Sequence, residues 1–148
     1  MKYIVRLMLS VMSMFSMGCV GENNSLKEDC FVGTWQSEGN AKIVLNKNGK
    51  GELFNFNYEN VNSIANKDSI LNGACEWKLE QINGSNKVAI AYYDGGTIQY
   101  LDKMVQTNLK ISFQIEGTGV FGNKPPWNLF VFIGDPDELN KYTFTKEE

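Results

Sequence analysis

The chain has 148 residues, of which 43% are hydrophobic, 17 are acidic and 14 are basic, and it contains no histidine. This length suits one globular domain, and a net charge of −3 with a single arginine disfavours nucleic acid as a partner. Without histidine the chain lacks the commonest general base and the commonest metal ligand, which disfavours most hydrolytic and metal-dependent chemistry.

The first residues have the pattern of an export signal. Lys2 and Arg6 flank the start of an uncharged apolar run at 7–15, which is too short to span a bilayer as a permanent helix. The four residues 16–19, SMGC, resemble the lipobox of bacterial lipoproteins, with serine where that family prefers leucine. The resemblance implies that the signal peptide is removed and that Cys19 becomes the lipidated first residue.

The same resemblance implies a location and a domain layout. Residues 1–18 would be the signal peptide, residues 19–29 a lipidated polar tether and residues 30–148 the folded domain. Val20 after the cysteine, in place of aspartate, implies the outer membrane of a bacterial envelope, with the domain facing the periplasm. A secreted or soluble periplasmic protein and an unprocessed soluble domain are the alternatives. Removal of residues 1–18 leaves 12 basic and 17 acidic side chains, a net charge of −5.

Cys30 and Cys75 are the two cysteines that remain if Cys19 carries lipid. An even number of cysteines in an oxidising compartment predicts a disulfide between them. In the chain-entropy model a closed loop of about 45 residues contributes on the order of 4 kcal/mol to stability. A pair of buried thiols is the alternative. A metal site is not expected, because the chain has no histidine and no C-x-x-C spacing.

Alternation of apolar and polar residues dominates the chain from Cys30 onward. The segment 108–117, NLKISFQIEG, alternates over its whole length, as a half-buried strand does. The segment 75–82 alternates as well, and further strands are predicted at 32–38, 41–46, 51–58, 87–93, 127–133 and 141–146. About eight strands joined mostly by short turns predict an all-β antiparallel meander, closed into a barrel or alternatively folded as a sandwich. A short helix is expected within 97–104.

The strand predicted at 51–58 carries an expectation about its two faces. Strict alternation places Phe54 and Phe56 on one face and Asn55 and Asn57 on the other. Asparagine is a poor strand former. We therefore expect the asparagine face to meet water.

The first predicted strand carries a second resemblance. Gly33-x-Trp35 resembles the Gly-x-Trp signature of lipocalin-like barrels, and the later segments 74–81 and 142–148 are similar in placement to strands of small lipocalin-like bacterial lipoproteins. This implies a lipocalin-like barrel over about residues 31–146, in which Gly33 lets the entering chain pass closely and Trp35 plugs the closed end. Family members usually lay an arginine from the last strand over this tryptophan. Here Lys141 or Lys146 would have to take its place.

Catalytic motifs are missing from the sequence. No G-x-S-x-G elbow frames a serine, and no glycine-rich phosphate loop with a lysine is present. Asp135, Asp137 and Glu138 form the densest acidic cluster, but the EF-hand spacing and its glycine are absent, so we interpret the cluster as a solvated turn. We expect a non-enzymatic protein without a cofactor or a metal.

Two connections are candidates for recognition, and one strand adds a further hint. The connection at 116–128 carries Phe121 between glycines and leads to Trp127, and long loops on a rigid sheet are where binding residues concentrate. Alternatively, Phe121 folds back to cap the barrel. The connection at 58–73 is a crossover or lid, or a plain structural link. The strand at 127–133 is apolar on both faces and needs cover from the chain itself or from a partner.

These features favour an envelope protein that binds another protein, such as an immunity or inhibitor protein that neutralises a toxin or hydrolase. Phe121 and Trp127 would make the contact, and Asp135 and Asp137 would steer a basic partner. The alternatives are a lipocalin-like carrier of a small apolar ligand and a structural lipoprotein without a pocket. Nine Phe, six Tyr and three Trp residues favour a packed interior over a ligand cavity. The sequence carries no signal of oligomeric state.

Overall fold

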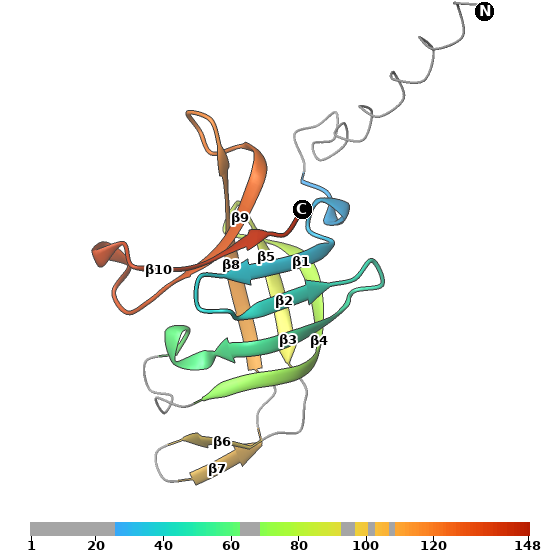
Figure 1. Ribbon diagram of the computed structural model, residues 1–148. Helices are drawn as coiled ribbons and strands as arrows, with labels where there is room; N and C mark the ends of the chain where they lie inside the picture. Colours follow the sequence, from blue (N-terminus) through green and yellow to red (C-terminus); the bar gives the residue numbers. More distant parts are fainter. Residues whose placement is uncertain (1–25, 63–68, 93–96, 101–102, 107–108) are drawn as a thin grey trace, which may run out of the picture.

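The protein is an all-β closed barrel of eight antiparallel strands, seen in a computed structural model that describes residues 26–62, 69–92, 97–100, 103–106 and 109–148 (Figure 1). The barrel strands are β1 (Gly33–Ser37), β2 (Lys42–Leu45), β3 (Lys50–Asn57), β4 (Ile70–Ile82), β5 (Ser85–Tyr92), β8 (Leu109–Thr118), β9 (Lys124–Phe132) and β10 (Lys141–Lys146). Their order around the barrel is β1-β10-β9-β8-β5-β4-β3-β2. The predicted barrel is confirmed, and the sandwich does not form.

Short 3-10 turns and one extra hairpin complete the described structure. The turns are η1 (Glu28–Cys30), η2 (Tyr58–Asn60) and η3 (Pro136–Glu138). A separate antiparallel hairpin of β6 (Thr97–Tyr100) and β7 (Lys103–Gln106) interrupts the chain between β5 and β8. The helix expected within 97–104 is therefore wrong. The segment is rich in β-branched and aromatic residues, which favour strands.

Because neighbouring strands run in opposite directions, the connections gather at two ends of the barrel (Figure 1). The η1 end holds η1, the β2–β3, β4–β5 and β8–β9 connections, and the C-terminus. The η3 end holds the β1–β2 turn, η2, η3 and the β6–β7 hairpin. Residues 1–25, with the expected signal peptide and Cys19, lie outside the described residues.

Aromatic side chains fill much of the barrel interior. Phe56 from β3, Phe113 from β8 and Phe144 from β10 are fully buried. Phe144 stacks on Phe56 with ring centroids 5.7 Å apart and meets Phe113 edge-on, also at 5.7 Å. Tyr142 joins this cluster with its centroid 4.7 Å from that of Phe144. The interior is thus occupied by rings that pack in the offset and edge-on arrangements that aromatic pairs prefer.

A bulge in β3 changes the faces predicted for that strand. Asn55 has φ 49, in the left-handed region, and the pairing with β4 shifts between Leu53 and Phe56. The backbone N–H of Asn55 donates to the Asn72 side-chain oxygen at 2.8 Å. As a result Phe54 is exposed while Phe56 is buried, so the prediction that they share one face is wrong.

Candidate functional site

The η1 end of the barrel is closed by Trp35 and Lys146. The Trp35 indole donates to the Phe31 carbonyl oxygen at 2.8 Å, and its ring stacks on that of Phe31. Lys146 Nζ donates to the Cys30 carbonyl oxygen at 3.0 Å and lies 5.8 Å from the centroid of the Trp35 ring. Lys146, and not Lys141, therefore lies where the resemblance placed an arginine.

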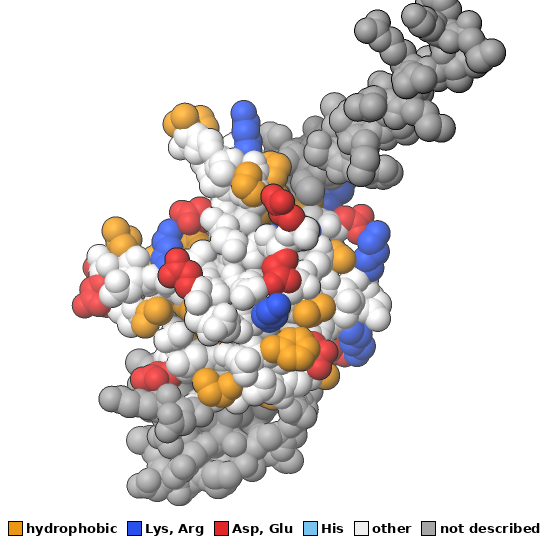
Figure 2. All heavy atoms as spheres, viewed as in Figure 1, with side chains coloured by type: hydrophobic (Ala, Val, Ile, Leu, Met, Phe, Trp, Pro, Cys, Tyr) orange, Lys and Arg blue, Asp and Glu red, His pale blue; other side chains and the backbone are white. Residues whose placement is uncertain are grey.

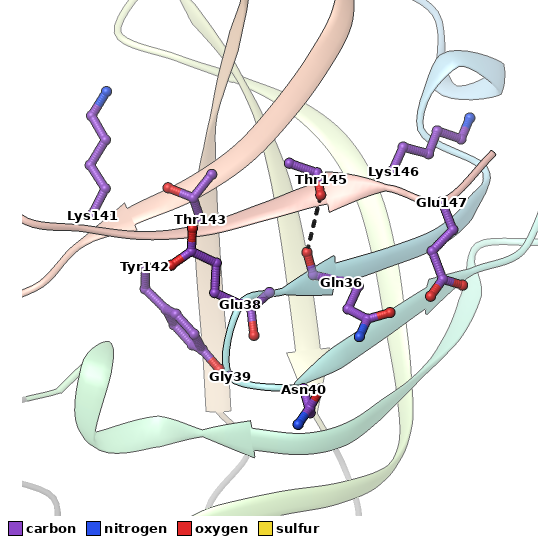
Figure 3. Close-up of a pocket in the computed structure, with 11 residues that line it drawn as sticks. Gln36, Glu38, Gly39, Asn40, Lys141, Tyr142, Thr143, Thr145, Lys146 and Glu147 are labelled. Atoms are coloured by element: carbon purple, nitrogen blue, oxygen red, sulfur yellow. Dashed lines mark hydrogen bonds between the residues drawn. The ribbon is translucent and has the colours of Figure 1, made fainter.

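Gly33 makes room for this arrangement. Its φ of 137 is unusual for residues with side chains, and a Cβ added there would lie 2.8 Å from Cε of Lys146. Figure 3 shows Lys146 extending from β10 toward η1. The glycine and the tryptophan of the predicted signature thus both belong to the closure of one barrel end.

A polar hollow of about 600 Å³ lies on the outside of the barrel, along β1 and β10 beside the β1–β2 turn (Figure 3). Its lining includes Gln36, Glu38, Thr143 and Glu147. Lys42 Nζ lies 3.1 Å from Oε1 of Glu147. Lys141 and Lys146 line the same hollow as the carboxylates of Glu38 and Glu147. Most of the lining side chains are exposed, and the lining carries charges of both signs, as on a solvated face of the sheet. Ser37 and Tyr142 are among the more buried members, and burial raises the pKa of the Tyr142 phenol.

The β8–β9 hairpin extends beyond the barrel wall at the η1 end (Figure 1). Val120 is 95% exposed and Phe121 is 86% exposed at its tip. Figure 2 shows apolar side chains at the end of this projection. The alternative in which Phe121 folds back over the barrel is wrong.

The base of this hairpin is tightly packed. Trp127 is only 6% exposed and lies against Gly117, where an added Cβ would overlap its ring. Trp127 supports the hairpin from below and presents little surface to a partner. Its indole N–H is buried and has no hydrogen-bond partner among the described residues.

The predicted acidic cluster lies in the η3 loop, residues 134–140, which also projects from the barrel (Figure 1). Asp135 caps η3, since its carboxylate accepts from the backbone N–H of Asp137 at 3.0 Å. The next residue after η3, Leu139, has φ 57 and is 72% exposed. The loop closes through the backbone N–H of Ile133, which donates to the Asn140 carbonyl oxygen at 2.9 Å.

Leu139 is a surface residue that the sequence analysis missed. A large aliphatic side chain in the left-handed region is uncommon, and its exposure adds a second unfavourable feature. Asp135, Asp137 and Glu138 are exposed beside it in the same loop. Figure 2 shows acidic side chains near an apolar one on this projection. A leucine directly after three acidic residues in a turn was the available signal.

The four residues predicted to bind a partner do not form one site. Phe121 lies before β9 and Asp135 and Asp137 lie after it, so they are at opposite ends of a nine-residue strand. Such a strand is about 30 Å long. A single partner interface of ordinary size would therefore be centred either on the hairpin or on the η3 loop, and not on both.

Cys30 and Cys75 are both buried and are not bonded to each other. The predicted disulfide is therefore absent from this structure. Cys30 lies in η1, just before β1, and Cys75 lies in β4. Strands β2 and β3 separate β1 from β4 around the barrel. Burial, and secondarily the charge of Glu52, raise the pKa of the Cys75 thiol to about 12.

The strand that is apolar on both faces is covered by the chain itself at Phe130. Phe130 on the outside of β9 is buried, packs edge-on against Phe132 and lies beneath Lys141, whose Nζ is 4.2 Å from the ring centroid. Lys141 is held in place by Glu116 at 2.9 Å. The expectation of intramolecular cover is confirmed at this position.

Within the described ranges no three acidic or cysteine side chains are grouped so that they could hold a metal ion. The described residues also contain no helix of the length and apolarity that a membrane crossing requires. Comparisons of the chain with family models, with curated proteins and with solved structures gave no match.

Proposed function

We propose that the mature chain is a non-enzymatic, lipid-anchored protein of the bacterial envelope that binds a protein partner through the η3 loop. The partner would be a toxin or hydrolase that the chain neutralises, as an immunity or inhibitor protein does. The observation that carries this proposal is Leu139, an exposed leucine held in the left-handed region beside three exposed carboxylates. Uncommon backbone conformations of this kind concentrate at functional sites, where other interactions outweigh their cost.

The η3 loop has the composition of a small contact surface. Leu139 supplies an apolar side chain to bury, and Asp135, Asp137 and Glu138 give the loop a charge of −3 without a lysine. Carboxylates around an apolar anchor favour a basic partner and accelerate its association. The Asp135 cap and the Ile133–Asn140 hydrogen bond fix the loop before binding, which lowers the ordering cost.

The packed interior argues against the carrier of a small apolar ligand. Carriers built on eight-stranded barrels need an interior that side chains leave open. Here Phe56, Phe113 and Phe144 meet one another in the interior. The hollow along β1 and β10 lies on the outside of the barrel and is polar. Protein binding on the outer surface is therefore the better supported function.

Affinity capture tests the η3 loop. The mature chain is immobilised through its N-terminus and exposed to an envelope extract, and each retained protein is then purified and titrated in solution. We expect Leu139→Ser to weaken the specific complex about tenfold, since truncation of a central apolar contact costs roughly 1–2 kcal/mol. Asp137→Asn should slow association, most strongly at low salt.

Matched controls lie at the η1 end. Val120→Ser removes an aliphatic side chain that is more exposed than Leu139, and Asp29→Asn removes an exposed carboxylate. Both variants should bind as the parent does. Equal affinity for the parent and Leu139→Ser would exclude the η3 loop as the contact surface.

The lipid anchor needs its own test. The intact mass of the protein extracted from membranes is compared with that of a Cys19→Ser variant. We expect a chain that begins at Cys19 and carries acyl groups, and we expect the variant to lack them. A parent mass without lipid would remove the anchor from the proposal and leave the η3 loop to be judged by the capture experiment.

A further inference from the structure

The tip of the β8–β9 hairpin remains unexplained by a contact at the η3 loop. Val120 and Phe121 are the two most exposed large apolar side chains of the described residues, and they are adjacent in sequence. The backbone N–H of Gly117 donates to the Gly122 carbonyl oxygen at 3.0 Å, and the N–H of Gly122 donates to the Gly119 carbonyl oxygen at 3.1 Å. The tip is thus a defined turn that presents two apolar side chains to solvent.

Charge distinguishes this hairpin from the rest of an acidic protein. Between Glu116 and Asp135 the only charged residue is Lys124. Its side chain passes beside the turn, with Cδ 3.7 Å from the position of a Cβ at Gly119. A lysine stem can lie along an apolar surface while its ammonium group reaches lipid phosphates. The hairpin is therefore suited to a lipid bilayer, which has an apolar interior and negatively charged phosphates at its surface.

The path of the N-terminal chain points to the same end of the molecule. Leu26 lines a hollow of about 310 Å³ together with Gly122 and Asn123 of the hairpin. Leu26 lies seven positions after Cys19 in the sequence, and seven extended residues reach at most about 25 Å. A lipid on Cys19 would therefore hold the bilayer close to the hairpin, whereas the η3 loop lies at the far end of β9.

We propose that Val120 and Phe121 insert into the bilayer to which the N-terminus is attached, with Lys124 at the lipid headgroups. This inference rests on the lipid anchor of the proposed function. It gives the barrel an orientation in which the η1 end faces the membrane and the η3 loop faces away from it. A bilayer fits the tip better than a protein does, because Gly119 and Gly122 directly flank the two apolar side chains, so no polar side chain is adjacent to them in sequence to offer directional hydrogen bonds.

Tryptophan fluorescence on vesicles tests the insertion. Residues 20–148, which include every described residue, carry an N-terminal hexahistidine tag and bind vesicles of phosphatidylcholine and phosphatidylglycerol that contain a nickel-chelating lipid. In Phe121→Trp the added indole should shift its emission to shorter wavelength on the vesicles and be quenched by lipids with brominated acyl chains. Leu139→Trp, at the far end, should show neither change. Spectra of the parent account for Trp35, Trp77 and Trp127.

The outcomes separate this inference from the anchor itself, because the tag supplies the attachment. Unshifted and unquenched emission from Trp at position 121 on vesicle-bound protein would overturn the insertion, even if the intact mass shows lipid on Cys19. A shifted and quenched signal supports the insertion whatever the mass shows. The proposal would also be overturned if the emission of Trp at position 121 does not change on vesicles alone but shifts when a protein from the envelope extract binds. That result would assign the hairpin to a protein partner.

Discussion

At the scale of single residues, the closure of the η1 end depends on one lysine. Lys146 donates to the Cys30 carbonyl oxygen and lies over the ring of Trp35, so it links the last strand to the turn that precedes the first. The barrel closes through the pairing of β1 with β10, and Lys146 is itself a paired residue, opposite Trp35. Its loss should therefore loosen the seam at which the barrel closes.

We predict that Lys146→Met lowers the free energy of unfolding by about 1 kcal/mol, since a charge-assisted hydrogen bond and a cation–π contact are lost while the aliphatic stem is kept. Lys47→Met is the matched control, because within the described part of the chain Lys47 makes only an exposed pair with Asp29 at 3.8 Å. Denaturant titrations of the two variants and the parent measure the difference. Equal loss in both variants would show that Lys146 has no special role.

The cysteines yield a second prediction. Native protein at pH 8 should resist alkylation at Cys75, because the thiol is buried and its pKa of about 12 keeps it protonated. In denaturant without a reductant, both Cys30 and Cys75 should accept an alkyl group, as read from the intact mass. If both resist until a reductant is added, the disulfide predicted from the sequence exists after all.

Stability at high pH should depend on Cys75. Its folded-state pKa is raised above the usual value of 9.0, so its contribution is complete below pH 9 and is lost as the pH rises from 9 toward 12. Between pH 9 and pH 10.5 this loss amounts to about 2 kcal/mol. Cys75→Ala should remove that part of the pH dependence, which denaturant titrations at both pH values measure. Parallel curves for parent and variant would contradict the burial of this thiol.

At the scale of elements, the β8–β9 hairpin depends on the packing at its base. Gly117 lies against the Trp127 ring and the Lys124 backbone, where an added methyl group has no space. We predict that Gly117→Ala destabilises the protein by about 2 kcal/mol and moves the Trp127 ring, because overpacking a tight contact forces a shift of backbone or ring. Thermal unfolding and near-UV circular dichroism detect the two effects.

Gly39→Ala is the control for this substitution. Gly39 lies in the β1–β2 turn, its φ is not in the left-handed region, and the nearest atom to an added Cβ would be Ser37 Oγ at 3.9 Å. The variant should unfold as the parent does. A Gly117→Ala protein as stable as the control would mean that the hairpin base is loosely packed.

The strands could be predicted from the sequence because the pleat of a sheet imposes alternation on any strand with one buried face. All eight predicted segments overlap barrel strands. Alternation failed at Asn55, where a bulge inserts one residue and exchanges the faces. It also failed at 97–104, which was too short a segment to separate a helix from the β6–β7 hairpin.

The surfaces were harder to predict than the strands. Phe121 and the acidic turn stood out by composition, but only the barrel topology places them at opposite ends of β9. Leu139 was missed because its exposure follows from a left-handed backbone that the η3 turn imposes, and no periodic pattern reports such a conformation. Trp127 was assigned to the surface, whereas its contact with Gly117 buries it.

At the scale of the whole molecule, the β8–β9 hairpin and the η3 loop project from opposite ends of the barrel and differ in chemistry. The η1 end carries the start of the described chain, the C-terminus and an apolar hairpin with one lysine. The η3 end carries an exposed leucine among carboxylates. In the proposed arrangement the first end meets the membrane and the second meets a basic protein.

Photo-crosslinking in intact cells tests this arrangement most directly. A benzophenone amino acid replaces Leu139 in one full-length protein and Phe121 in another, and irradiated products are separated by mass. We predict that the probe at 139 links the chain to one defined protein and that the probe at 121 gives lipid adducts without a protein band. A protein band from position 121 together with none from position 139 would contradict both the contact surface and the orientation.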